Sequence, residues 1–310
     1  MTAGTIREIP VSGADAGPYG ITVGPDGALW LTLVHAGAVA RLGVDGGLRT
    51  WPVGEGSRPL IVTPGPDGAL WFTRSGDDRI GRITTAGEQS AVVLPAGTGP
   101  GGIAAGGDGA LWYAGMTSDT LGRVATDGEV TSFPLPPGGM PSMVTAGPDG
   151  GVWFTLNRAD AVGRIDPDSG RVAVHPLPTV GAAPVGITAG VDGAVWFVEI
   201  GAGQVGRITP DGRIDEYPLP DRAARPHAIV ADPAGGCWWT EWAANRIGHV
   251  DADGAITNHA LPTPSREPHG LTVTPDGTVW AALETGSLAH LTPTPPRPPG
   301  SPLVDHEVDR

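Results

Sequence analysis

The chain has 310 residues, including 50 glycines and 33 prolines, and a formal charge of −14. Such an acidic chain is a poor binder of nucleic acids and of anionic membranes, so we expect neither as a partner. All 19 basic residues are arginine, because the sequence contains no lysine. This excludes Schiff-base and P-loop lysines. The single cysteine, Cys237, excludes an internal disulfide and a thiolate metal cluster.

The first residues, 1–8, lack the basic and apolar regions of a secretory signal. No apolar run in the chain is long enough to span a bilayer. We therefore expect a cytoplasmic protein.

One phrase, Gly-Pro-Asp-Gly-Ala-Leu-Trp, occupies positions 24–30 and 65–71, and variants of it recur along the chain. The copies end at Trp30, Trp71, Trp112, Trp153, Trp196, Trp238 and Trp280. Their spacing of 41 to 43 residues is the length of a four-stranded propeller blade. Asp-Gly between alternating apolar residues predicts antiparallel hairpins. The sequence therefore predicts an all-β, seven-bladed β-propeller with four antiparallel strands per blade.

The two ends of the chain are expected to complete the last blade together. After Leu291 the sequence becomes rich in proline, which cannot form a strand ladder, so the seventh copy lacks its fourth strand. Residues 4–11 resemble the fourth strand of other copies, such as 213–219, and we predict that they close the ring. Residues 1–293 then form a single domain, which we expect to be monomeric, and residues 294–310 form a disordered tail.

Comparison of the seven copies separates residues that maintain the fold from residues that depart from it. The ring position, as we name it, follows the proline that opens the first strand of each copy. Its occupants are Tyr19, Leu60, Gly101, Ser142, Val185, His227 and His269. First strands line the central channel of a propeller. We therefore expect a ring at one mouth of the channel, with histidines from two adjacent blades.

Two carboxylates also depart from the repeat, both in the seventh copy. Glu267 precedes the opening proline and shares a strand face with His269. Glu284 lies four residues after the core tryptophan, at the end of the second strand. Because the first two strands form a hairpin, Glu284 should lie beside Glu267 and His269. We expect this polar group at the channel mouth to bind a ligand.

Glu267 and Glu284 are hard oxygen ligands, and with bound waters they suit Mg²⁺. Zn²⁺ held by both carboxylates and His269 is the alternative, although zinc favours sites richer in His or Cys. A histidine next to such a metal is a natural general base, and His269 is the candidate.

Aromatic residues at the mouth predict a surface for a bulky ligand. Trp242 stands where other copies have smaller residues, and with Tyr19 it would form part of an apolar floor. His35 lies in a loop one residue beyond the equivalent place, and we do not count it among the site residues. The remaining recurrent residues, including the Asp of each Asp-Gly turn, are expected to serve the fold.

The blade phrase and the last two copies resemble the streptogramin B lyases, also called virginiamycin B lyases. The resemblance covers residues 4–292 and is most specific in Pro226–Ile229, Cys237–Trp242, Glu267–Gly270 and Trp280–Glu284. It implies that Glu267 and Glu284 bind Mg²⁺, that His269 is the general base, and that His227 contacts the substrate. It also implies elimination at the threonyl ester of a cyclic depsipeptide antibiotic, which linearises that small molecule and inactivates it.

Two other functions remain open at this point. One is a metal-dependent lactone or ester hydrolase, in which the metal activates water. Such sites carry more oxygen ligands, and Asn157 is the only further blade-matched candidate. The other is a propeller that binds a ligand without catalysis, which predicts no metal at Glu267 and Glu284.

Overall fold

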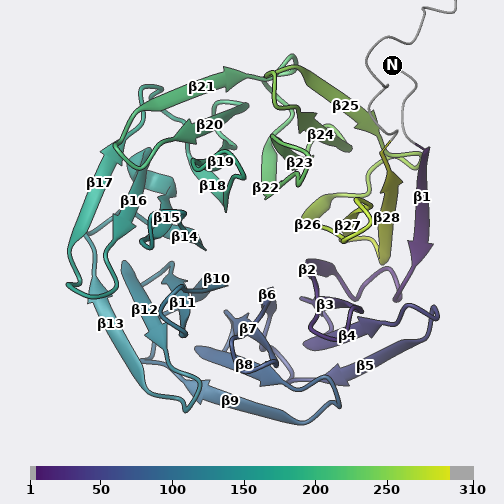
Figure 1. The fold of residues 1–310 in the computed structure, drawn as a ribbon. Helices are drawn as coiled ribbons and strands as arrows, with labels where there is room; N and C mark the ends of the chain where they lie inside the picture. Colours follow the sequence, from purple (N-terminus) through teal and green to yellow (C-terminus); the bar gives the residue numbers. More distant parts are fainter. Residues whose placement is uncertain (1–4, 294–310) are drawn as a thin grey trace, which may run out of the picture.

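The computed structural model describes residues 5–293 and consists almost entirely of β-strands (Figure 1). The strands form seven sheets of four, which surround a central axis (Figure 1). This confirms the predicted seven-bladed propeller. Among the described residues, no helix has the length and hydropathy needed to cross a membrane. The predicted tail, 294–310, lies outside the described residues.

The four strands of each blade follow one another from the central axis outward. Blade 1 consists of β2 (Pro18–Val23), β3 (Leu29–Leu33), β4 (Ala38–Leu42) and β5 (Leu48–Pro52). Blade 2 consists of β6 (Pro59–Pro64), β7 (Leu70–Arg74), β8 (Arg79–Ile83) and β9 (Gln89–Val93). Blade 3 consists of β10 (Pro100–Ala105), β11 (Leu111–Gly115), β12 (Thr120–Val124) and β13 (Val130–Pro134). Blade 4 consists of β14 (Pro141–Ala146), β15 (Val152–Leu156), β16 (Ala161–Ile165) and β17 (Val172–Pro176), with a short 3₁₀ helix, Asn157–Ala159, after β15.

Blade 5 consists of β18 (Pro184–Ala189), β19 (Val195–Glu199), β20 (Gln204–Ile208) and β21 (Ile214–Pro218). Blade 6 consists of β22 (Pro226–Ala231), β23 (Cys237–Glu241), β24 (Arg246–Val250) and β25 (Ile256–Ala260). Blade 7 consists of β26 (Pro268–Val273), β27 (Val279–Leu283), β28 (Ser287–Thr292) and β1 (Thr5–Pro10).

The N-terminal strand closes the ring, as predicted. β1 pairs antiparallel with β28, from Thr5 opposite Thr292 to Pro10 opposite Ser287. Figure 1 shows this strand, in purple, beside the last strand of the chain, in yellow. Closure leaves blade 7 next to blade 1, so residues from the two ends of the sequence become neighbours.

The hydrophobic core is divided among the spaces between neighbouring blades. Between blades 3 and 4, for example, Trp112 and Leu121 pack against Phe154 and Ile165. The thiol of Cys237 lies in one of these clusters, where burial raises its pKa. It is therefore a core residue and no nucleophile.

The recurrent polar residues of each blade hold its strands together. Asp26 accepts hydrogen bonds from Trp30 Nε1 at 3.0 Å and from Arg41 Nε at 2.6 Å. Blades 2 to 5 repeat this arrangement. In blade 6, His249 Nε2 takes the place of the arginine, 2.8 Å from Asp232. These aspartates serve the fold, which agrees with their interpretation as turn residues.

The innermost strands carry one extra residue just where they enter the mouth of the channel. In every blade the register shifts between the opening proline and the residue three places later. Such bulges redirect side chains and occur next to active sites. The ring position falls inside the bulge, so the fold itself turns these side chains toward the mouth.

Within residues 5–293, the buried carboxyl group of Glu199 has no cationic partner in an ion pair. Glu199 is fully buried, and only one of its oxygens is bonded, to Gln204 Nε2 at 2.6 Å. The equivalent residue of blade 6, Glu241, instead accepts a hydrogen bond from Arg246 Nε at 2.7 Å. Burial, followed by the charge of Glu216, raises the pKa of Glu199 to about 7. The folded protein thus favours the protonated form of this carboxyl.

We expect Glu199→Gln to stabilise the protein more at pH 8 than at pH 5. Because the pKa is raised from 4.5 on folding, the unfolded chain ionises first as the pH rises. Wild-type stability should therefore fall between pH 4.5 and 7, by up to about 3 kcal/mol, and the amide removes this loss. Urea denaturation of both proteins at pH 5 and pH 8 measures their free energies of unfolding. If Glu199→Gln changed the free energy of unfolding by the same amount at pH 5 and at pH 8, the prediction would be wrong.

Candidate functional site

Three aromatic rings from three blades meet at the mouth of the channel. Tyr19, His227 and His269 occupy the ring position of β2, β22 and β26. Tyr19 stacks on His269 with ring centroids 4.4 Å apart, and His227 meets His269 edge-on at 4.9 Å. The hydroxyl of Tyr19 lies 3.3 Å from His227 Nε2. The structure therefore brings together the ring residues that the repeat comparison singled out.

A carboxylate from the end of β27 binds this aromatic group. His269 Nε2 donates a short hydrogen bond to Glu284 Oε2. The backbone N–H of Glu284 donates to the carbonyl of Glu267 at 3.2 Å, so the two acidic residues lie side by side in the hairpin. The predicted neighbourhood of Glu284, Glu267 and His269 is thus present.

His35 also belongs to this group, and its exclusion on sequence grounds was wrong. Its Nε2 donates to Glu284 Oε1 at 2.6 Å. His35 follows β3 in blade 1, whereas Glu284 follows β27 in blade 7. Comparing positions within single blades cannot detect a contact that crosses the closure of the ring. The signal that could have found it is the predicted neighbourhood of the first and last blades.

The charges at the mouth are set by burial and by these contacts. The hydrogen bond from His269 is the largest cause that lowers the pKa of Glu284 to about 2, against the opposing effect of burial. Burial, then the charge of Glu284, raises the pKa of Tyr19 to about 12. Burial, then the charge of His269, lowers the pKa of His227 to about 3. At neutral pH the site holds an ionised carboxylate, a protonated tyrosine and a neutral His227.

Two nitrogens of the site lack partners. Nδ1 of His227 and Nδ1 of His269 are buried, and neither has a hydrogen bond within the described part of the chain. Burying an unpaired polar atom costs free energy that a ligand or a water could recover. Such groups are typical of functional positions.

Glu267 presents its carboxylate differently from Glu284. Its side chain is exposed, and none of residues 5–293 forms a hydrogen bond or ion pair with its carboxylate. Its backbone is left-handed, with φ of 51°. The equivalent residue of every other blade also has positive φ, so this conformation belongs to the repeat and carries no special strain at the site.

The two carboxylates fit a hard divalent cation by their chemistry. Glu284 is ionised and Glu267 is exposed, and carboxylate oxygens are the preferred ligands of Mg²⁺. Across residues 5–293, no group of three or more His, Cys, Asp and Glu is arranged to hold a metal ion. A cation here would take two protein oxygens and complete its shell with water or substrate.

Two other predicted residues contribute less to the site. Trp242 follows β23 and is half-buried. Its backbone N–H donates a hydrogen bond to the carbonyl of Arg225. No ring contact joins it to the histidines among the described residues. Asn157 donates to the carbonyls of Ala183 and Pro184 at 3.2 and 3.3 Å. Its amide nitrogen thus joins blades 4 and 5.

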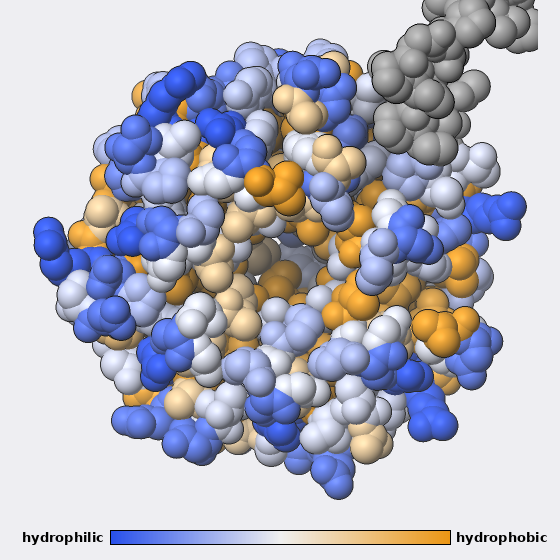
Figure 2. Space-filling view, viewed as in Figure 1, coloured by the Kyte–Doolittle hydropathy of each residue, from blue (hydrophilic) through white to orange (hydrophobic). Residues whose placement is uncertain are grey.

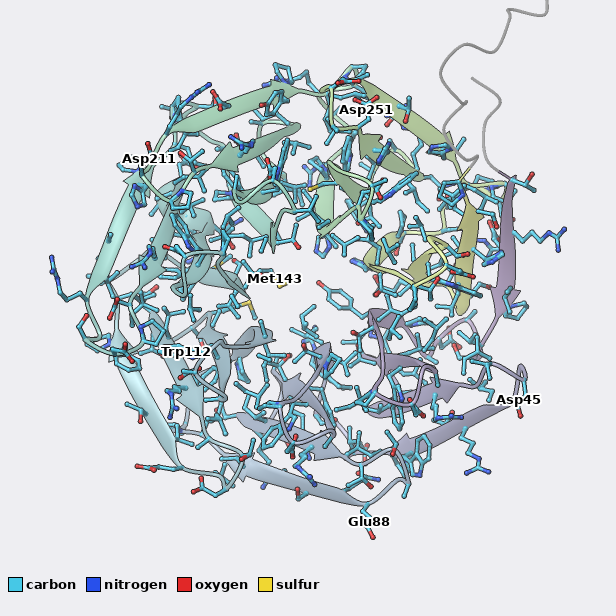
Figure 3. The ribbon with its side chains drawn as sticks, viewed as in Figure 1. Asp45, Glu88, Trp112, Met143, Asp211 and Asp251 are labelled. Atoms are coloured by element: carbon cyan, nitrogen blue, oxygen red, sulfur yellow. The ribbon has the colours of Figure 1, made fainter. Side chains whose placement is uncertain are left out.

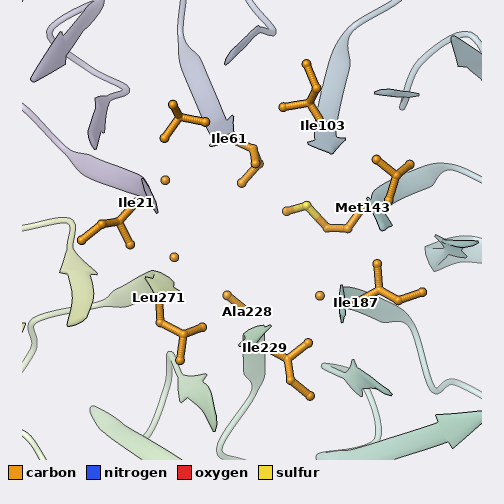
Figure 4. Close-up of a pocket in the computed structure, with 13 residues that line it drawn as sticks. Ile21, Ile61, Ile103, Met143, Ile187, Ala228, Ile229 and Leu271 are labelled. Atoms are coloured by element: carbon orange, nitrogen blue, oxygen red, sulfur yellow. The ribbon is translucent and has the colours of Figure 1, made fainter. Parts of the chain in front are cut away.

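Beyond the mouth the channel is apolar. A cavity of about 160 Å³ is lined by one aliphatic residue per blade and by the residues next to them. These aliphatic residues are Ile21, Val62, Ile103, Val144, Ile187, Ile229 and Leu271. Figure 4 shows Ile61 and Met143 pointing toward its centre, and Figure 2 shows the central opening surrounded by a hydrophilic outer rim. Among the described residues that line this cavity, none has a polar side chain.

Comparison with known proteins identifies relatives of this fold and site. The model of the Virginiamycin B lyase family matches residues 4–291. A solved streptogramin B lyase structure is 38% identical, with a TM-score of 0.90 over 94% of this chain and 98% of that chain. A catalytically inactive variant of virginiamycin B lyase from Staphylococcus aureus, solved with quinupristin, is 37% identical, with the same TM-score over 94% of this chain and 99% of that chain.

A curated relative shares a shorter segment. The virginiamycin B lyase of Mycobacterium sp. (strain KMS) is 56% identical over 54 residues, which are 17% of this chain and 18% of the relative. This match therefore spans less than a fifth of that protein. The family model and the solved structures, in contrast, cover nearly the whole chain. The chain belongs to the virginiamycin B lyase family.

Proposed function

We propose that this protein is a Mg²⁺-dependent lyase that linearises type B streptogramins and so inactivates them. The observation that carries the proposal is the hydrogen bond between His269 and Glu284 at the channel mouth, in a chain of the virginiamycin B lyase family. A relative in this family was solved with quinupristin as a catalytically inactive variant. That structure supports a small-molecule ligand for this protein as well.

The reaction we propose is an elimination at the ester that closes the ring of the antibiotic. His269 takes the proton from Cα of the threonyl residue. The electrons of the C–H bond form a Cα–Cβ double bond, and the bond between Cβ and the ester oxygen breaks. The oxygen leaves as part of a carboxylate. No water is consumed, so the linear product has the same mass as the substrate.

The residues of the mouth suit this chemistry. While Nε2–H of His269 donates to Glu284, the lone pair of the neutral imidazole lies on Nδ1, which has no partner among the described residues and can accept the proton. Tyr19 stacks on the imidazole and limits its rotation, and neutral His227 can offer or accept a hydrogen bond to substrate. Glu267 and Glu284 would hold Mg²⁺. When bound, the ion would polarise substrate carbonyl oxygens and make the Cα proton more acidic.

A single incubation distinguishes this function from the alternatives. The purified protein is mixed with a type B streptogramin and Mg²⁺, with a chelator in a parallel sample, and the product is examined by mass spectrometry. We expect a linear product of unchanged mass that is absent with the chelator. A product heavier by one water would instead indicate the hydrolase, and no product would favour a binding protein.

We expect His269→Ala to lower the rate of linearisation by about 10²–10⁴-fold, because this is the usual contribution of general acid–base catalysis. Steady-state rates on a type B streptogramin at saturating Mg²⁺ measure the loss. His259→Ala is the control, because His259 lies on the outermost strand β25. A wild-type rate in His269→Ala would show that another group is the base.

We expect Glu284→Gln to weaken Mg²⁺ binding, because the amide loses the negative charge of a ligand. Calorimetric titration with MgCl₂ measures the affinity directly, and the Mg²⁺ dependence of the rate should shift in parallel. Glu88→Gln, with the same charge change at the outer edge of the disc (Figure 3), should leave both unchanged. An unaltered Mg²⁺ affinity in Glu284→Gln would rule this carboxylate out as a ligand.

A matched pair of threonines tests how the backbone of His269 is held. Thr240 Oγ1 donates to the carbonyl of His269 at 2.7 Å, and Thr73 Oγ1 donates to that of Gly101 at 2.7 Å in the equivalent joint. Both threonines are fully buried. Replacing either with valine leaves a carbonyl unpaired and should cost about 1–3 kcal/mol of stability.

Only Thr240→Val is expected to slow the reaction, by up to about 10²-fold, because small displacements of a catalytic group are costly. Thermal denaturation and initial rates of both variants provide the comparison. Equal rates in the two variants would show that the Thr240 bond contributes to the fold alone.

A further inference from the structure

We propose that His35 is a positioning residue for this reaction and that Gly17 provides the space it needs. The inference rests on the proposed function, because it concerns the carboxylate that binds His269. His35 does not touch the reacting atoms in this arrangement. It acts through Glu284.

The first observation is the shared carboxylate. Glu284 accepts one hydrogen bond from His269 at Oε2 and another from His35 at Oε1. A carboxylate held at both oxygens cannot rotate freely, so its plane is defined by the two histidines. Because Glu284 in turn holds the imidazole of His269, the position of His35 sets the orientation of that ring. The two histidines come from opposite ends of the chain.

The second observation is the close packing of Gly17 against the imidazole of His35. Gly17 immediately precedes the opening proline of blade 1 and has φ of 69°. A Cβ atom at this position would overlap His35 Cδ2 and lie 2.9 Å from Val34 Cγ1. Any side chain at residue 17 would therefore push the imidazole away from Glu284. In blade 7 the same position holds Glu267, so glycine is not demanded by the repeat.

In other blades the residues equivalent to Gly17 and His35 also lie next to each other. The residue equivalent to His35 is Gly76 in blade 2 and Gly201 in blade 5. A Cβ on either glycine would come closest to a backbone carbonyl, 1.9 Å from Gly56 O or 2.2 Å from Gly181 O, and would lie 3.1 Å from Arg58 Cγ or Ala183 Cβ. In blade 1 the residue equivalent to these glycines is His35, whose imidazole reaches Glu284 across the junction between blades 1 and 7.

The comparison blade for an experiment is blade 3. Gly99 also precedes the opening proline, has φ of 53°, and would place a Cβ 2.5 Å from Thr117 Oγ1. Alanine at 17 or at 99 therefore introduces the same backbone strain and a similar local clash. Only alanine at 17 displaces a residue that binds Glu284.

The test uses four variants of the full chain: His35→Ala, His35→Gln, Gly17→Ala and Gly99→Ala. Rates are measured on a type B streptogramin with Mg²⁺. The ring nitrogens of His269 are observed by ¹⁵N NMR in the absence of substrate, at constant pH, after histidine-selective labelling. The NMR signal reports the bond between His269 and Glu284 whether or not the protein acts on streptogramins.

We expect His35→Ala to lower kcat by about 10- to 100-fold with little change in KM, which is the usual effect of losing a group that orients another. The ¹⁵N shifts of His269 should move in parallel. His35→Gln keeps an N–H donor at a similar reach, so it should restore most of the rate and the wild-type shifts. Gly17→Ala should resemble His35→Ala, while Gly99→Ala should resemble wild type.

Unchanged His269 shifts or an unchanged kcat in His35→Ala would overturn the role of His35. Equal behaviour of Gly17→Ala and Gly99→Ala would overturn the role of Gly17. If the wild-type protein does not act on streptogramins, the proposed function fails. The shifts of His269 in the four variants then still decide whether His35 orients it through Glu284.

Discussion

The ladder between β1 and β28 is the interaction on which the rest of the site depends. Six residue pairs join the first strand of the chain to the last, and they bring blade 7 against blade 1. Tyr19 and His35 precede residue 40 of the sequence, whereas His269 and Glu284 follow residue 260. These groups contact one another only because the ring is closed. Stability and function are thus coupled in this protein, since opening the ring would separate the two halves of the site.

Close packing around the axis turns this closure into a defined geometry. A Cβ on Gly270 would lie 2.6 Å from the carbonyl of Tyr19, so the innermost strands of blades 7 and 1 approach more closely than a side chain allows. On the other side, Thr240 binds the carbonyl of His269 from blade 6. The backbone of His269 is therefore held from both neighbouring blades. The bulge in β26 then turns its side chain to the mouth.

Burial and one carboxylate separate the roles of two neighbouring histidines. His227 is half-buried and has no carboxylate partner among residues 5–293, and desolvation lowers its pKa and keeps it neutral. His269 donates to Glu284, whose own pKa falls to about 2 in consequence. Titratable neighbours whose environments differ in this way are typical of acid–base sites. Glu284 thereby has two uses in the proposed function: it holds a histidine, and it offers an anionic oxygen to a cation.

The repeat in the sequence was enough to predict the seven blades, the closing strand and the residues that meet at the mouth within one hairpin. Tryptophans at a period of 41 to 43 residues indicated the blades, and the repeat made departures such as His227, His269 and Glu284 visible. Contacts within one hairpin, such as that of Glu284 with His269, follow from register. The contact of His35 with Glu284 emerges only when the blades pack together, because it crosses the junction between blades 1 and 7. Asn157 shows the same limit, since the bonds of its side chain to blade 5 depend on how two blades pack. A repeat defines what lies within each unit, but packing between units defines which side chains meet.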